Sequence, residues 1–173
     1  DTRPLGYINY GVEDVNVYDY ADMSISPSPT GDMAYQRWYP TAINLANGKI
    51  LMVGGIDGNG QGVGMPELYT PGVGWKSLTG AYSGEIAADW WYPRTWLNSD
   101  GKVVMFGTVG GMQNYAIHVM DPSGEGRVDI VGNLPFLTNN SLPAIMYEDA
   151  LKNWGVEESP QVLIEMATKG YMD

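Results

Sequence analysis

Oxygen-bearing side chains gather in one glycine-rich loop, Asp57-Gly58-Asn59-Gly60-Gln61-Gly62. Asp57 and Asn59 have the spacing of the first ligands in a calcium loop, because this hard cation prefers carboxylate and carbonyl oxygens. Such a loop is closed by a bidentate glutamate at its twelfth position, which here is Leu68, while Glu67 comes one residue early. Asp57 and Asn59 are therefore the candidate calcium ligands, although we expect an acidic hairpin loop without a bound cation.

Groups for nucleophilic or transition-metal chemistry are scarce. The chain contains one histidine, His118, and no cysteine. His118 alternates with apolar neighbours in the stretch AIHVMD, so we expect a strand residue that is either hydrogen-bonded or half-exposed. Without a serine or cysteine partner it is not expected to act as a catalytic base.

Aromatic side chains with polar tips form a third group. Trp90, Trp91 and Tyr82 can stack on sugar rings, or they can pack between neighbouring sheets, and the sequence leaves both uses open. Twelve tyrosines and six tryptophans against two phenylalanines are typical of a β-sheet protein.

The charge balance excludes some partners. There are 20 acidic against 9 basic residues, a net charge of −11, which argues against binding to nucleic acid or to an anionic membrane surface. No run of 18 apolar residues occurs, so membrane insertion is not expected. The first residues lack the basic and apolar regions of a signal peptide, as those of a mature secreted chain would.

The stretch RWYPTAINLANGKILMVGG is nearly repeated as WWYPRTWLNSDGKVVMFG. When Trp38 is aligned with Trp91, the register holds without a gap to Gly54 and Gly107. In each copy Tyr-Pro favours an extended segment, and Asn-Gly or Asp-Gly predicts a tight hairpin with both turn residues at positive φ. The apolar residues that follow, 50–53 and 103–106, are predicted to be strands buried on both faces.

A second element follows each hairpin and contains Tyr69 or Met120. Together with Tyr18 these residues are spaced by 51. A period of about 50 residues is typical of a four-stranded kelch-type propeller blade. We therefore predict an all-β fold of kelch-type β-propeller blades, each a four-stranded antiparallel sheet, in an incomplete propeller.

The predicted blades divide the chain into four parts, namely a blade end at 1–34, blades at 35–88 and 89–140, and the start of a further blade at 141–173. That last part holds a weaker copy, with Pro143–Tyr147 and Gln161–Glu165 as its strands. Propellers close with about 4 to 8 blades, so about three cannot form a ring. The expected partners are the remaining blades of a longer chain or other copies of this one.

The RWYP opening, its DG-turn counterpart and the stretches VYDY, PELYT and PAIMY together resemble the galactose oxidase and glyoxal oxidase family of copper-radical kelch propellers. In that family the tyrosine of the R-x-Y opening is a copper ligand, is crosslinked to a cysteine and carries the radical. The resemblance implies this role for Tyr39. The other ligands, a tyrosine and two histidines, come from later blades.

This sequence departs from the family in two ways. It has no cysteine to crosslink Tyr39, and the loop after its Gly-Gly pair has no aromatic residue to stack on that tyrosine. Copper prefers imidazole and soft ligands, so no cofactor is expected for the chain alone. Copper is expected only in a full-length parent.

Two functions stay open. The chain is expected to be a fragment of a secreted copper-radical oxidase that converts primary alcohols or aldehydes. The alternative is a non-catalytic extracellular propeller that binds glycans or serves as a structural, self-associating protein.

Overall fold

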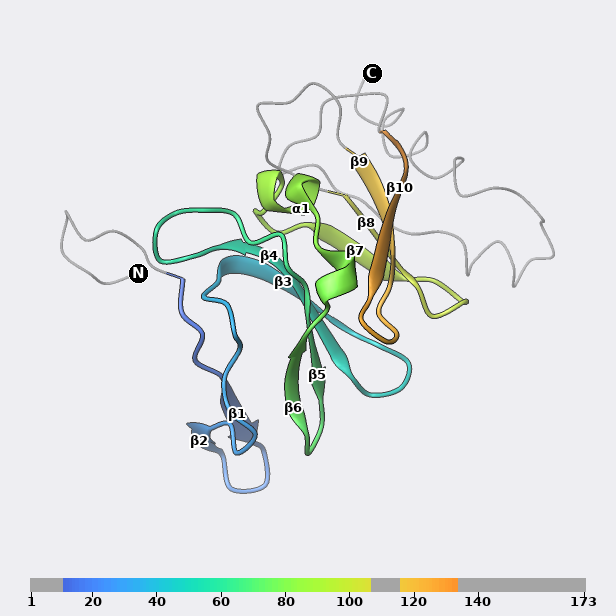
Figure 1. The fold of residues 1–173 in the computed structure, drawn as a ribbon. Coiled ribbons are helices and arrows are strands. Elements are labelled where there is room, and N and C mark those ends of the chain that lie inside the picture. The colour runs from blue at the N-terminus through green and yellow to red at the C-terminus, as the bar shows by residue number, and fades with distance from the viewer. Residues whose placement is uncertain (1–10, 107–115, 134–173) are drawn as a thin grey trace, which may run out of the picture.

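The computed structural model describes residues 11–106 and 116–133, and this part of the chain is nearly all β (Figure 1). One antiparallel sheet has four strands in the order β3 (Trp38–Asn44), β4 (Ile50–Ile56), β5 (Glu67–Thr70) and β6 (Gly74–Ser77). The second has β7 (Arg94–Leu97), β8 (Val103–Phe106), β9 (Ala116–Asp121) and β10 (Arg127–Asn133), again with consecutive strands adjacent. A separate hairpin is formed by β1 (Asn16–Asp19) and β2 (Ser24–Pro27). This is the architecture of an incomplete β-propeller, as predicted.

The two copies of the sequence repeat occupy equivalent places in the two sheets. Met52 of β4 lies opposite Glu67 of β5, and Met105 of β8 lies opposite His118 of β9. The strands fall inside the predicted ranges 35–88 and 89–140, and the blade boundaries themselves stay predictions. The predicted blade start at 141–173 lies outside the described residues.

The hairpin turns differ from the sequence prediction. Gly48 has a φ of +78° and Gly101 a φ of +76°, but neither Asn47 nor Asp100 has a positive φ. The Gly48 N–H donates to the carbonyl of Leu45 (3.0 Å). In each loop the turn is therefore followed by one glycine in the left-handed conformation. Such a loop needs positive φ at one residue, whereas the predicted hairpin turn needs it at two.

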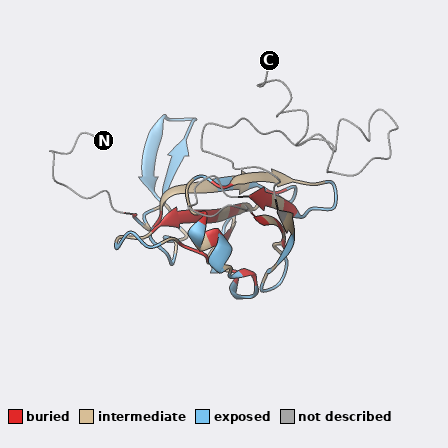
Figure 2. Ribbon diagram, turned by 90° about the horizontal axis from the view of Figure 1, so that it is seen from above, coloured by how far each residue is buried: buried red, intermediate tan, exposed pale blue. Residues whose placement is uncertain are grey.

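The core lies between the two sheets (Figure 2). Leu51, Val53, Val103 and Met105 are buried in it, together with Met120, Leu78, Ala81 and Ile86. The strands at 50–53 and 103–106 were predicted to be buried on both faces, which is right in full for one face. On the opposite faces Phe106 is buried, and Ile50, Met52 and Val104 are half-buried.

A linker with two short helical turns joins the sheets, η1 (Thr79–Ala81) and α1 (Gly84–Ala88). The Ser83 hydroxyl caps α1 by accepting the N–H of Ile86 (3.3 Å), and Ile86 enters the core. The sequence did not predict this helix, because five residues are too few to show a helical period. The stretch YEDALKNWG at 147–155, whose sequence favours a short helical turn, lies outside the described residues.

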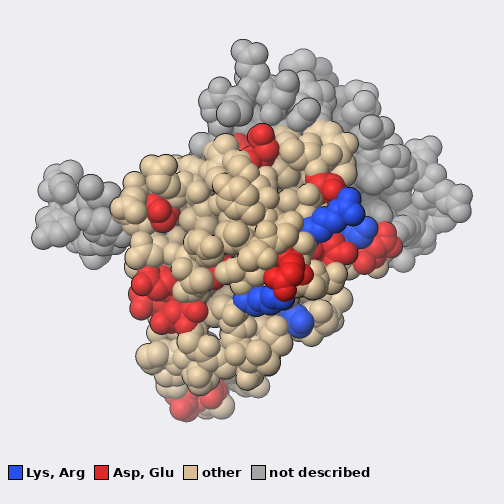
Figure 3. Space-filling view, viewed as in Figure 1, with Lys and Arg blue, Asp and Glu red and all other residues tan. Residues whose placement is uncertain are grey.

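Charged groups on the face seen in Figure 3 are few, and the basic ones lie beside acidic ones. Lys76 and Glu125 form an ion pair (2.7 Å) that links β6 to the β9–β10 turn, and Arg127 pairs with Asp129 (2.9 Å). Within residues 11–106 and 116–133, no helix is long and apolar enough to cross a membrane.

Gly54 and Gly48 form a matched pair that tests how closely the sheets approach. Both have positive φ, but a Cβ on Gly54 would lie 2.7 Å from the Pro93 ring and from the Trp90 carbonyl oxygen, whereas one on Gly48 would meet nothing within 4 Å. Gly48→Ala should cost about 1–2 kcal/mol of unfolding free energy from backbone strain. Gly54→Ala should cost about 1–3 kcal/mol more, because backbone must also move. Urea denaturation of both variants measures this, and equal losses would contradict the tight contact between sheets.

Candidate functional site

Tyr39, near the start of β3, and Tyr92, two residues before β7, share an unusual backbone conformation. Their φ angles are +59° and +43°, a region that is uncommon for residues with side chains. Each precedes a proline, which disfavours helical backbone, so the surrounding structure must impose this conformation. The Tyr92 N–H donates to the carbonyl of Tyr39 (3.1 Å). Strain of this kind costs about 1–3 kcal/mol per residue and gathers at functional sites, so this end of the two strands is the candidate site.

Five aromatic rings pack on one another at this place. Trp38 stacks on Tyr39 with ring centroids 4.0 Å apart, and Tyr39 lies 5.0 Å from both Trp91 and Tyr92. Trp90 lies 5.2 Å from Trp91. We refer to these five residues as the aromatic cluster. The cluster joins the two sheets. Trp90 and Trp91 therefore pack between neighbouring sheets, which is one of the two uses that the sequence left open.

The aromatic cluster is also open to solvent at one side. Tyr92 is 42% exposed, and it borders an open groove of about 520 Å³ between β3 and β7, lined by residues 40–43 and 92–96. Tyr82, the third aromatic residue singled out in the sequence, is exposed on the linker and is not part of the cluster.

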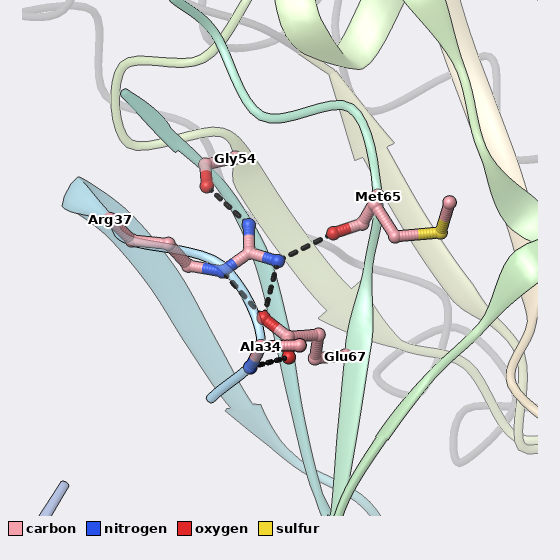
Figure 4. A network of polar contacts seen from close by, with 5 residues as sticks. All are labelled: Ala34, Arg37, Gly54, Met65 and Glu67. Carbon is pink, nitrogen blue, oxygen red and sulfur yellow. Dashed lines mark hydrogen bonds and ion pairs between the residues drawn. The ribbon is translucent and has the colours of Figure 1, made fainter. Parts of the chain in front are cut away.

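A buried ion pair lies beside the cluster (Figure 4). The Arg37 guanidinium and the Glu67 carboxylate are fully buried, with Nη2 at 2.9 Å and Nε at 3.2 Å from the same carboxylate oxygen. Arg37 also donates to the carbonyls of Gly54 (2.6 Å) and Met65, and Glu67 accepts the N–H of Ala34 (2.6 Å). Burial lowers the pKa of Arg37 and the bonds to Glu67 raise it. The sequence showed Arg37 in the repeat but gave no signal that Glu67 was its partner.

The candidate calcium residues do lie together in the loop after β4. The Asp57 carboxylate accepts the N–H groups of Asn59 and Gln61, both at 2.8 Å, and these bonds, that of Gln61 first, lower its pKa. The loop is therefore organised by its own backbone donors. Glu67, the nearest glutamate to the closing position, is engaged with Arg37.

His118 is buried, with 1% exposure, contrary to the half-exposed or hydrogen-bonded state that the sequence predicted. Neither ring nitrogen has a hydrogen-bond partner among the residues that the structure describes. Burial lowers its pKa, against an opposing effect of Glu85. Since His118 takes the place in β9 that Glu67 takes in β5, and Trp90 takes the place of Arg37, the equivalent positions of the second sheet do not form this ion pair.

Asp89 is a second buried acid that the sequence did not reveal. It follows α1 and is 6% exposed. Burial, and then the charge of Glu85, raise its pKa to about 6.

Neither family models nor curated proteins gave a match to this sequence. Among solved structures, the chain is similar to a fungal alcohol oxidase of the AA5 family in complex with copper, with a TM-score of 0.58 and 20% sequence identity. The match covers 78% of this chain and 28% of that one. At this identity the likeness shows the fold alone, and the chain spans little more than a quarter of the length of that oxidase.

Removing Glu67 should be severely destabilising. Glu67→Ala leaves the Arg37 charge buried without its partner, which typically costs about 3–5 kcal/mol. The double variant Arg37→Met/Glu67→Leu should recover most of that loss, because no charge remains buried. Asp129→Asn, which breaks an exposed pair, is the matched control and should cost less than about 1 kcal/mol. Urea denaturation measures all three, and a Glu67→Ala loss no larger than the control's would contradict the burial of this pair.

Asp89 should make stability fall as pH rises. Its folded pKa of about 6 lies above its ordinary value of 3.8, so the unfolded chain releases this proton first. The resulting penalty develops as pH rises through about 6. The advantage of Asp89→Asn over the wild-type chain should therefore grow by roughly 1–2 kcal/mol between about pH 5 and about pH 7.5. Unfolding curves at the two pH values measure this difference, and a constant difference would show that Asp89 has an ordinary pKa.

Proposed function

We propose that this chain is a segment of a secreted, kelch-type, galactose oxidase-like copper oxidase, which oxidises primary alcohols or aldehydes once its remaining blades are present. One observation carries the proposal. Tyr39, which the sequence resemblance matches to the metal-binding tyrosine, is held in a strained conformation at the start of β3. The copper alcohol oxidase that shares the fold supports it.

The described residues do not fit a copper site by themselves. Residues 11–106 and 116–133 contain no group of three or more His, Cys, Asp or Glu side chains placed to hold a metal. The chain has no cysteine, and the His118 ring lies among the buried residues of the second sheet. In this proposal the chain contributes Tyr39, and imidazole ligands come from other parts of the parent protein.

Arg37 supports Tyr39 from two residues away. Its side chain ties the start of β3 to the carbonyl of Gly54 in β4 and to Glu67 in β5. Its own N–H and carbonyl bond to Val12. These bonds fix the position of β3 where it begins, next to the aromatic cluster. Tyr39 needs such support, because a strained backbone conformation persists only when the surrounding structure holds it.

The alternative function is a non-catalytic extracellular propeller that binds glycans. It is favoured by the 42% exposure of Tyr92 beside the open groove, because an exposed aromatic face can stack on a sugar ring. In that case Tyr92→Ala should abolish glycan binding, and Tyr82→Ala, a change at an exposed linker tyrosine, should leave it intact.

Copper titration of the 173-residue chain tests where the ligands lie. We expect no stoichiometric copper(II) site by spectroscopy, and no peroxide release from primary alcohols or glyoxal-type aldehydes, because the described residues offer too few ligands. A tight site that Tyr39→Phe removes and Tyr92→Phe keeps would contradict the placement of the other ligands outside this chain.

The same two variants test the oxidase assignment in the longer parent. Tyr39→Phe should abolish copper-dependent peroxide release. Tyr92→Phe, which changes a tyrosine with the same backbone conformation one repeat later, should retain most of it. Equal activity of the two variants would contradict the assignment of Tyr39 as the metal-binding tyrosine.

A further inference from the structure

The aromatic cluster connects Tyr39 to the surface of the molecule. Tyr39 is half-buried, and its ring centroid lies 5.0 Å from that of Tyr92. Tyr92 is 42% exposed and borders the groove between β3 and β7. Rings with centroids at this separation form an ordinary aromatic contact, and electron tunnelling across such a contact is fast because the gap between the ring edges is short. An electron can therefore pass from Tyr39 to the groove in two short steps.

The ring contacts favour Tyr39 as the residue on which an oxidised state would rest. Trp38 stacks on Tyr39 with the ring centroids 4.0 Å apart and the ring planes 20° apart, and Trp91 and Tyr92 each lie 5.0 Å away. Among the described rings, the contact of Tyr92 is with Tyr39. A ring stacked face to face stabilises an oxidised neighbour, because its π electrons are polarised toward the electron-deficient ring.

Backbone bonds between the two sheets hold the rings at these separations. The Tyr92 N–H donates to the carbonyl of Tyr39 (3.1 Å), and the Gly55 N–H donates to that of Trp90 (2.7 Å). Fixed donor and acceptor rings transfer an electron with little structural rearrangement. The chain has no cysteine, so no thiol of its own competes with the tyrosines for an oxidant.

We propose that Tyr92 is the relay residue through which an outer-sphere one-electron oxidant in the groove oxidises Tyr39. The oxidant takes one electron from Tyr92, and the Tyr92 phenol releases its proton to water. Tyr39 then passes one electron to the Tyr92 radical and releases its own proton to water, while Tyr92 regains a proton from water. The net products are a tyrosyl radical at Tyr39, one proton in solution and an oxidant reduced by one electron.

This inference rests on the proposed function, in which Tyr39 is the redox-active tyrosine of a copper oxidase. It adds the route by which Tyr39 is oxidised before turnover, and Tyr92 takes no part in the conversion of the alcohol. The rings of the route lie at the junction of the two described sheets, so the route is complete within the described residues. It can therefore be tested without copper and without the remaining blades.

Flash photolysis of the copper-free 173-residue chain tests the relay. Because the chain has no cysteine, Ala42→Cys allows a single ruthenium(II) polypyridyl label to be attached at Ala42, an exposed residue that lines the groove. Oxidative quenching of the excited label by a cobalt(III) ammine gives ruthenium(III), the one-electron oxidant. A nitroso spin trap followed by peptide mass spectrometry then identifies the residue that carries the radical, and we expect an adduct on Tyr39.

Variants at Tyr92 separate a redox role from a structural one. Tyr92→Phe keeps the ring but removes the oxidisable phenol, so most of the adduct on Tyr39 should be lost. Tyr92→Trp restores an oxidisable ring and should restore the adduct. Tyr82→Phe, at an exposed linker tyrosine outside the cluster, is the matched control and should leave the adduct unchanged. A label on Ala46→Cys, in the turn beyond the end of β3 and away from the groove, should give little adduct on Tyr39.

Several outcomes would overturn the relay. They are a Tyr39 adduct that Tyr92→Phe leaves undiminished, a loss that Tyr92→Trp does not reverse, equal adduct from the labels at positions 42 and 46, and a wild-type chain without an adduct on Tyr39. Copper is absent from every arm, so these outcomes do not depend on whether the parent protein binds it. The oxidase assignment is tested separately, by peroxide release from the Tyr39→Phe parent.

Discussion

The buried ion pair between Arg37 and Glu67 is the interaction on which the first sheet depends. Two charges are removed from water, and such a pair is tolerated only when further hydrogen bonds satisfy its remaining donors and acceptors. Those bonds go to Gly54, Met65 and Ala34, so the pair connects β4, the loop before β5 and the segment before β3. The backbone of Arg37 adds Val12 to this set. Residues spread over more than fifty positions of the sequence are thereby held at one end of the sheet.

The strained tyrosines are positioned by these constraints. Tyr39 follows Arg37 by two residues, and its carbonyl accepts the N–H of Tyr92 from the second sheet. Gly55, opposite this region in β4, donates to the carbonyl of Trp90 (2.7 Å). The aromatic cluster then fills the junction with rings instead of charged groups. A site here is rigid because backbone bonds between the sheets, and not only side-chain packing, set the position of both tyrosines.

The two sheets fill equivalent buried positions with different side chains. Glu67 and His118 occupy equivalent buried places, opposite Met52 and Met105, but among the described residues only Glu67 of the two forms an ion pair. In the second sheet Trp90 replaces Arg37 and joins the aromatic cluster, and burial keeps the pKa of His118 low. The ion pair is thus a property of one blade and not of the repeat, which is why the repeat alone did not predict it.

The sequence by itself determined the repeat, the all-β class, the four-stranded sheets and the strands at 50–53 and 103–106, because alternation, turn residues and a fixed period are local properties of the chain. It placed Tyr39 and Tyr92 at equivalent positions for the same reason. Only the tertiary structure decided that Glu67 partners Arg37, that both tyrosines have positive φ, and that Asp89 and His118 are buried. These features arise from contacts between residues distant in sequence, whose burial and distances no local pattern records. The short helix α1 belongs with them, because its five residues are too few to show a helical period and the burial of Ile86 depends on the surrounding core.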